Sequence, residues 1–280
     1  MSYEIHIKPN RSWIRFNIKE IIEYKDLLYL LVRRDFVSRF KQTVLGPAWF
    51  VIQPLFMTVI FTVIFGKIAS IPTDGLPQML FYQCGLLIWN YFNTTFTSNA
   101  GIFTANAAIY SKVYYPRIIN PLANCISGLF GLAIQFITFI GFFIYFKFFT
   151  NAGSTFGMNS QALLFIPLIL QVLLLALGMG LWMSVLTAKY RDLAHLQGLI
   201  TQALMYSSII YPMSSVPERF QWVAYINPLS PTVEACRILL LGKGNLAPEQ
   251  MFCSLAWTTI ILITGMLLFQ KTERTVVDTV

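Results

Sequence analysis

Six long apolar stretches divide the chain, and short polar or basic segments separate them. They cover residues 48–66, 79–101, 118–146, 162–187, 196–212 and 253–270, and none contains Asp, Glu, Lys, Arg or His. Each is about long enough to cross a hydrocarbon core of roughly 30 Å as a helix. The pattern predicts an all-α polytopic membrane protein with six transmembrane helices.

The absence of ionisable side chains from these stretches bears on how the protein could work. Ion-coupled pumps and proton relays keep such groups at membrane depth, because those groups carry the coupling. We therefore expect the energy for any uphill transport to enter from outside the bilayer.

The N-terminal segment, residues 1–47, differs from the apolar stretches. Its later part, about 26–42, alternates an apolar face around Phe36 and Val37 with a polar face. This pattern is typical of an amphipathic helix that lies in the membrane interface. We expect residues 1–47 to form a cytoplasmic arm and this interfacial helix, residues 48–270 the transmembrane domain, and residues 271–280 a cytoplasmic tail.

Composition and charge agree with this arrangement and orient it. Of the 280 residues, 56% are hydrophobic and 11% charged, whereas soluble proteins carry roughly 25% charged residues. With the N-terminus inside, fifteen of the twenty Lys and Arg residues lie on the cytoplasmic side. The positive-inside rule therefore predicts that both termini are cytoplasmic.

Between the last two apolar stretches, residues 213–252 are rich in apolar side chains but broken by prolines. They predict two short helices, about 217–225 and 229–241, each too short to span a membrane. A re-entrant pair that dips into the protein is the economical interpretation, and an ordinary external cap is the alternative. Glu234 and Arg237 are three residues apart on the second helix, so we expect them to pair with each other.

Polar residues follow one face of the second apolar stretch. Gln83, Asn90, Asn93, Thr94 and Thr97 fall on one helical stripe, bordered by Tyr82 and Trp89. An amide that faces lipid costs several kcal/mol, so the stripe should face protein or water. Polar helix–helix packing would explain it. The alternative is a channel wall whose amides and aromatic rings suit the hydroxyls and C–H faces of a sugar.

A basic cluster precedes the first apolar stretch. It contains Arg33, Arg34, Arg39 and Lys41. The simplest interpretation is a solvated face that binds anionic lipid head groups. The sharper one is a docking surface for a cytoplasmic partner or a site for an anionic head group, since arginine suits phosphate.

Catalytic and metal-binding motifs are missing from the sequence. No G-x-x-x-x-G-K-[ST] nucleotide loop occurs, and His6 and His195 lie far apart in no ligand spacing. The four cysteines are scattered, and the spacing of Cys236 and Cys253 fits no disulfide or metal framework. We expect no catalytic site, no metal, no cofactor bound by this chain and no nucleic-acid partner.

Three segments together resemble the permease subunit of ABC-2-type polysaccharide exporters, which move O-antigen, capsule or teichoic acid. They are residues 34–49 (RDFVSRFKQTVLGPAW) running on to Gln53-Pro54, residues 112–117 (KVYYPR) followed by Pro121, and Asn227-Pro228 through Glu234 and Arg237. The similarity runs from about residue 20 onward. Residues 1–17 have no match in the pattern, and Pro47 stands where a bulkier aliphatic residue is more usual.

The resemblance implies a homodimeric permease of the bacterial cytoplasmic (inner) membrane that works with two copies of a separate cytoplasmic ABC ATPase. ATP and Mg would bind to that ATPase, and the substrate would be an undecaprenyl-linked glycan. A channel at the dimer interface would be lined by Tyr82, Gln83, Trp89, Asn90, Asn93, Thr94 and Thr97. The cytoplasmic mouth and the coupling contacts would involve Arg33, Arg34, Arg39, Lys41, Leu45, Gly46, Lys112 and Arg117. The outer gate would contain Trp222, Tyr225, Asn227, Pro228, Glu234 and Arg237.

Three other functions remain open at this level. The same class of transporter could export teichoic acid, a small molecule or a drug, although the Trp89–Asn90 pair favours a sugar. A membrane-embedded glycan-modifying enzyme is a different class, and the missing intramembrane histidines and carboxylates weigh against it. A structural scaffold leaves the polar stripe unexplained.

Overall fold

The computed structural model describes residues 18–41, 46–110, 112–113, 115–158 and 160–276, and these residues form helices and connecting turns without a strand. The α-helices are α1 (Ile18–Glu23), α2 (Lys25–Phe40), α3 (Trp49–Phe61), α4 (Gln78–Ala100), α5 (Ile102–Ala105), α6 (Ala107–Tyr110), α7 (Ile119–Phe149), α8 (Phe165–Lys189), α9 (Ala194–Ile209), α10 (Trp222–Ile226), α11 (Leu229–Leu241) and α12 (Pro248–Val276). A π-helical segment, Thr62–Ile68, extends α3. The predicted all-α class is confirmed for this part of the chain.

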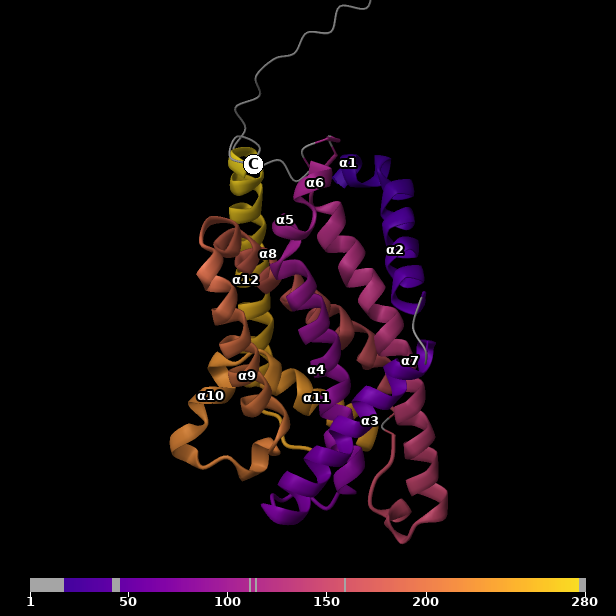
Figure 1. The fold of residues 1–280 in the computed structure, drawn as a ribbon. Helices are drawn as coiled ribbons and strands as arrows, with labels where there is room; N and C mark the ends of the chain where they lie inside the picture. The colour runs from indigo at the N-terminus through magenta and orange to yellow at the C-terminus, as the bar shows by residue number, and fades with distance from the viewer. Residues whose placement is uncertain (1–17, 42–45, 111, 114, 159, 277–280) are drawn as a thin grey trace, which may run out of the picture.

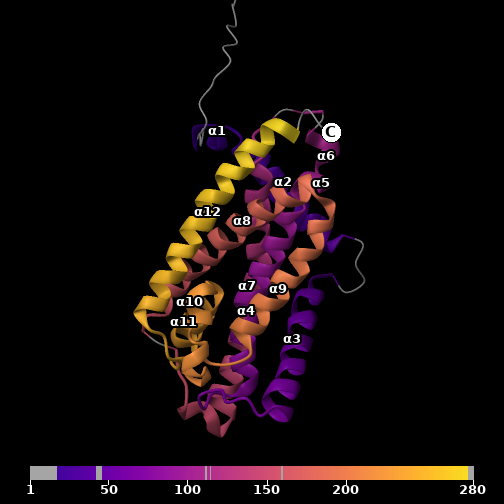
Figure 2. The same cartoon turned by 90° about the vertical axis from the view of Figure 1, so that its left-hand side faces the viewer.

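The long helices form an elongated bundle with two distinct ends (Figures 1 and 2). α1, the short helices α5 and α6, and the C-terminal end of α12 lie at one end, which is the upper end in both views. The helices α10 and α11 lie towards the other end, together with the connection from α3 to α4. Both ends of the described chain therefore lie on the same side of the bundle.

Among the described residues, four helical segments are long and apolar enough to cross a membrane, by length and composition. They are Val51–Ile68, Ile119–Phe149, Ala162–Lys189 and Pro248–Glu273. The other two predicted spans correspond to α4, whose amides lower its hydropathy, and to α9, which has 16 residues. Membrane crossing by α4 and α9 stays a prediction.

α4 is the central helix of the bundle. It packs against α3, α7, α8, α9 and α11. Residues 80–89 are all buried, so even polar side chains of this segment lie inside the protein. The interior position explains how a helix with so many amides is accommodated.

The sequence predicts that α2 lies in the membrane interface, and its position relative to a membrane stays a prediction. Within the bundle, α2 runs lengthwise beside the upper part of α7 (Figure 1). The rings of Phe36 and Phe130 are 4.9 Å apart and join the two helices. Val37 remains exposed, so the apolar face that the sequence predicted is only partly used in this contact.

α8 and α12 approach each other closely at two glycines. A Cβ atom at Gly178 would lie 2.8 Å from the backbone of Leu262, and one at Gly265 would lie 2.6 Å from the Gly178 carbonyl oxygen. Small residues allow such close packing between helices, where van der Waals contact is a main source of stability in membranes.

Replacing Gly178 with alanine should therefore force α8 and α12 apart. We expect a loss of about 1–3 kcal/mol in the free energy of unfolding, the usual cost of overpacking. Gly141→Ala in α7 is the matched control, because no atom lies within 4 Å of the added Cβ. Thermal unfolding of the purified protein in detergent measures both, and equal melting temperatures would contradict the packing argument.

Candidate functional site

The polar stripe of α4 opens onto a cavity of about 310 Å³ between α3, α4, α7 and α9. From α4 the cavity is lined by Trp89, Asn90, Asn93 and Thr94. The other helices contribute Trp49, Gln53, Pro54, Met57, Gln135, Thr201, Gln202 and Met205. No lining residue carries a charge, and the volume is at the lower end of the range of roughly 300–1,000 Å³ found for small-molecule sites.

The amides around this cavity are not equivalent. Asn90 donates from Nδ2 to Oε1 of Gln135 on α7 at 3.0 Å, so this pair joins two helices. Asn93 of α4, Gln53 of α3 and Gln202 of α9 line the cavity without a hydrogen bond from their side chains to the residues that the structure describes. Each free amide offers both donors and an acceptor to a ligand.

Two tryptophans contribute to the wall beside these amides. Trp89 is 6% exposed and packs against Phe92, with ring centroids 5.7 Å apart, whereas Trp49 is half exposed. The site therefore combines neutral hydrogen-bonding groups with aromatic surface. This arrangement can hold a neutral, hydroxyl-rich ligand, and it has no ionised group of its own for acid–base chemistry.

The remaining residues of the predicted stripe lie outside this cavity. Tyr82 is fully buried and Thr97 is exposed, and neither lines it. Gln83 borders a separate void of about 10 Å³, close to the smallest volume that can hold a water molecule. The stripe thus divides into a buried part, a part that lines the cavity, and an exposed part.

Eight of the twelve lining residues were not among the predicted channel residues, and four of these eight are polar residues that the sequence could have indicated. Gln53, Gln135 and Gln202 are isolated amides within apolar stretches, and Thr201 precedes the last of them. A buried amide needs a polar partner, so isolated amides in different spans tend to face one another or a cavity. The sequence does not reveal which spans are neighbours.

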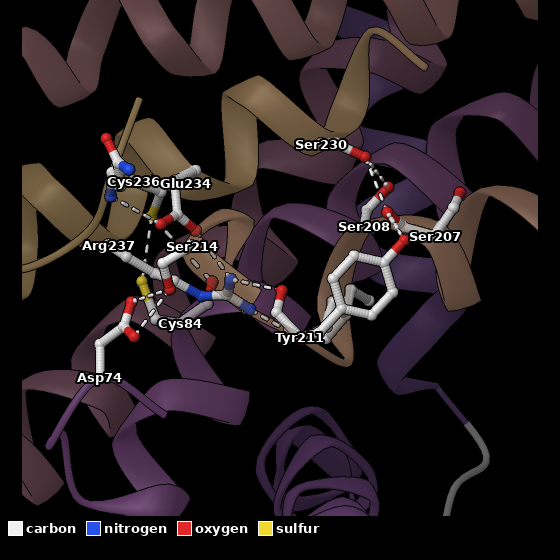
Figure 3. Close-up of polar contacts among 12 residues, drawn as sticks. Asp74, Cys84, Ser207, Ser208, Tyr211, Ser214, Ser230, Glu234, Cys236 and Arg237 are labelled. Carbon is white, nitrogen blue, oxygen red and sulfur yellow. Dashed lines mark hydrogen bonds and ion pairs between the residues drawn. The ribbon is translucent and has the colours of Figure 1, made fainter. Parts of the chain in front are cut away.

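The predicted pairing of Glu234 with Arg237 is confirmed. The two side chains are each 1% exposed, and Nη1 of Arg237 lies 3.0 Å from Oε2 of Glu234 (Figure 3). Arg237 also donates from Nη2 to the Ile209 carbonyl oxygen at 2.7 Å and from Nη1 to that of Tyr211 at 3.4 Å. The pair therefore ties α11 to the C-terminal end of α9.

α11 is buried along nearly its whole length, among α4, α8, α9 and α12. The guanidinium carbon of Arg237 lies 3.6 Å from the ring centroid of Phe81 on α4, and Sγ of Cys236 lies 3.3 Å from Sγ of Cys84. Both thiols are free, as is that of Cys253 on α12. α11 is thus part of the protein interior.

The turn between α10 and α11 is held by a second set of hydrogen bonds. Asn227 donates from Nδ2 to the hydroxyls of Ser207 at 2.7 Å and Ser208 at 2.9 Å. Its Oδ1 accepts from the backbone N–H of Leu229, next to the buried Pro228. Ser230 also joins this cluster, as Figure 3 shows. Of the other predicted gate residues, Trp222 is 57% exposed and Tyr225 is partly buried.

The predicted cytoplasmic residues that the structure describes lie in different environments. Arg33, Lys41 and Lys112 are exposed, Arg34 pairs with the adjacent Asp35 at 2.8 Å, and Gly46 takes a positive φ of 50°. Exposed pairs of this kind contribute about 0–1 kcal/mol. The side chain of Arg39 and residue Leu45 lie outside what the structure describes.

Arg117 lies in a different environment from the exposed basic residues. It is 7% exposed, and its Nη1 donates to the Glu273 carbonyl oxygen of α12 at 3.1 Å. Its guanidinium lies 5.0 Å from the ring centroid of Tyr110, and burial raises the pKa of that tyrosine. Asn120 donates to the Tyr110 hydroxyl at 2.7 Å. Arg117 therefore joins the loop after α6 to α12, and its guanidinium is engaged within the subunit.

Comparison with known proteins places these features in a family. The model of the ABC-2 type transporter family matches residues 26–241. An O-antigen export system permease protein RfbA from Klebsiella pneumoniae is 29% identical over 252 residues, which cover 88% of this chain and 92% of that protein. A protein of the same name from Myxococcus xanthus is 20% identical over 88% of this chain and 92% of its own length. The polysialic acid transport protein KpsM of Escherichia coli is 22% identical over 87% and 92%.

Proposed function

Because the chain belongs to the ABC-2 type transporter family, we propose that it is the transmembrane subunit of an ATP-driven exporter of a lipid-linked polysaccharide. The proposed substrate is an O-antigen type glycan on an undecaprenyl carrier, and the proposed location is the bacterial cytoplasmic (inner) membrane. Relatives named for O-antigen export and polysialic acid transport match most of the chain and support a polysaccharide.

The observation that carries this proposal is the chemistry of the cavity on α4. Its lining offers uncommitted amides on three helices, threonine hydroxyls and two tryptophans. Sugar hydroxyls need both donors and acceptors, and sugar C–H faces pack on aromatic rings. A teichoic acid is anionic and would find no cationic side chain in this cavity. Sites that bind drug-like molecules are typically more apolar than this one.

The same cavity lies at the side of the bundle, between the helices α3 and α9. Ile52, Phe56 and Val59 of α3 and Leu199 of α9 expose large apolar side chains. A second copy of the chain would cover such surface, and we place the channel at the interface of this homodimer. Two copies of a cytoplasmic ABC ATPase, which bind ATP and Mg, would supply the energy.

In the membrane, α4 and α9 would cross the bilayer in addition to the four apolar segments, which gives six transmembrane helices. Both termini would then lie in the cytoplasm. Residues 48–270 would then be the transmembrane domain, residues 1–47 and 271–280 its cytoplasmic flanks, and α2 a helix at the interface. The exposed Arg33, Lys41 and Lys112 would contact the ATPase or lipid head groups. α10 and α11 would form a re-entrant outer gate, which the buried position of α11 supports.

Deleting the gene for this protein in its source organism tests the function directly. We expect surface polysaccharide to disappear while its lipid-linked precursor accumulates in the cytoplasmic membrane, because synthesis continues without export. Extraction of the lipid-linked glycan and surface labelling of intact cells measure the two pools. Restoring the gene is the control, and unchanged pools in the deletion strain would refute the proposal.

A further inference from the structure

A second, smaller cavity lies at the lower end of the bundle, beside α10 and the start of α12. Its volume is about 190 Å³, below the roughly 300 Å³ at which sites for drug-sized ligands begin. Its polar lining comes from Gln221, Tyr225, Asn245 and Gln250, and Met213 and Val216 add apolar surface. These residues come from the segment after α9, the loop after α11, and the first turn of α12.

The amides of this cavity are available to a ligand. Gln221 and Asn245 are exposed, and their side chains make no hydrogen bond to the described part of the chain. Gln250 accepts at Oε1 from the backbone N–H of Ala247 at 3.3 Å, which leaves its two Nε2 donors for a ligand. As in the larger cavity, every lining side chain is uncharged.

Two hydrogen bonds and a glycine hold the frame of this cavity in place. Oε1 of Glu234 accepts from the backbone N–H of Asn245 at 3.0 Å, and Nε1 of Trp257 donates to the Tyr225 carbonyl oxygen at 2.9 Å. Gly244 has a φ of 149°, and a Cβ there would lie 2.9 Å from Oε1 of Glu234, so glycine lets the loop pass close to the carboxylate. The loop that carries Asn245 is therefore shaped by the same ion pair that ties α11 to α9.

We propose that this cavity is a second carbohydrate-binding site, on the outer side of the membrane, which holds one sugar unit of the glycan as it leaves the channel. The inference rests on the proposed export function. Three amides from separate segments converge beside a tyrosine, which suits the hydroxyls and C–H face of a neutral sugar. The small volume limits the site to a single unit of a longer chain.

Protection of an introduced cysteine tests this site in intact cells. Gln221→Cys is made in a Cys253→Ser background, because Cys84, Cys125 and Cys236 are buried. A membrane-impermeant maleimide is applied to cells that synthesise the glycan and to cells in which its synthesis is blocked. We expect labelling to be slower by about twofold or more in producing cells, as for a site occupied at least half of the time.

Ser154→Cys on the exposed loop after α7 is the matched control, and its labelling rate should be the same in both strains. Asn245→Cys serves as a second probe if Gln221→Cys reaches the membrane in reduced amounts. Equal rates in both strains, or no labelling from outside in either, would overturn the site. If the strain that lacks the gene nevertheless fails to export the glycan, the proposed export function stands and only this second site is rejected.

Discussion

Replacing Asn93 and Gln202 together with leucine is expected to lower export of the polysaccharide by about fivefold or more. Each side chain offers a free amide to the cavity, and a hydrogen bond contributes about 0.5–1.5 kcal/mol. Two lost bonds therefore amount to about 1–3 kcal/mol, which lowers affinity by about 5-fold to 150-fold. The substitution removes no hydrogen bond within the described part of the subunit. The effect should therefore fall on the substrate and leave folding intact.

The measurement is the ratio of surface polysaccharide to lipid-linked precursor in cells that carry each variant. Asn151→Leu makes the same kind of change at an exposed position outside both cavities and should leave the ratio unchanged. Trp89→Leu provides a second variant of the cavity wall. The amount of each protein in the membrane and its co-purification with the ATPase separate export from assembly. Normal export by both cavity variants would remove the cavity from the transport path.

Breaking the buried ion pair of α11 should have the largest effect on stability. Arg237→Met leaves the Glu234 carboxylate buried without its partner, and we expect a loss of about 3–5 kcal/mol. A loss of this size corresponds to a fall of about 10 °C in the melting temperature. The carbonyl oxygens of Ile209 and Tyr211 also lose their donor, so the end of α9 should loosen first.

The double variant Glu234→Leu with Arg237→Met should be more stable than Arg237→Met alone, because it leaves no unpaired buried charge. Arg219→Met, at an exposed arginine shortly before α10, is the matched control and should change the melting temperature little. Thermal unfolding in detergent, followed by the amount of protein that remains monodisperse, provides the measurement. A single variant as stable as the control would show that the pair is not needed for the packing of α11.

The sequence by itself determined the helical class and most of the helix boundaries. Uninterrupted apolar stretches predict helices because a buried backbone must satisfy its own hydrogen bonds, and the structure places helices at all six stretches. The Glu234–Arg237 pair was also predictable, since residues three apart on a helix are neighbours in any fold. The side chains of the α4 stripe were predicted to share one face, and α-helical periodicity alone sets that face.

Only the tertiary structure decided which faces meet. Helical periodicity does not say which helix lies opposite, so Gln53, Gln135 and Gln202 could not be assigned to one cavity with Asn93. Arg117 was grouped with exposed basic residues, but its partner Glu273 lies 156 residues further along the chain. The interior position of α11 likewise depends on α4, α8, α9 and α12 surrounding it. Local sequence sets the pattern on each helix, whereas contacts between distant helices set the burial and the site.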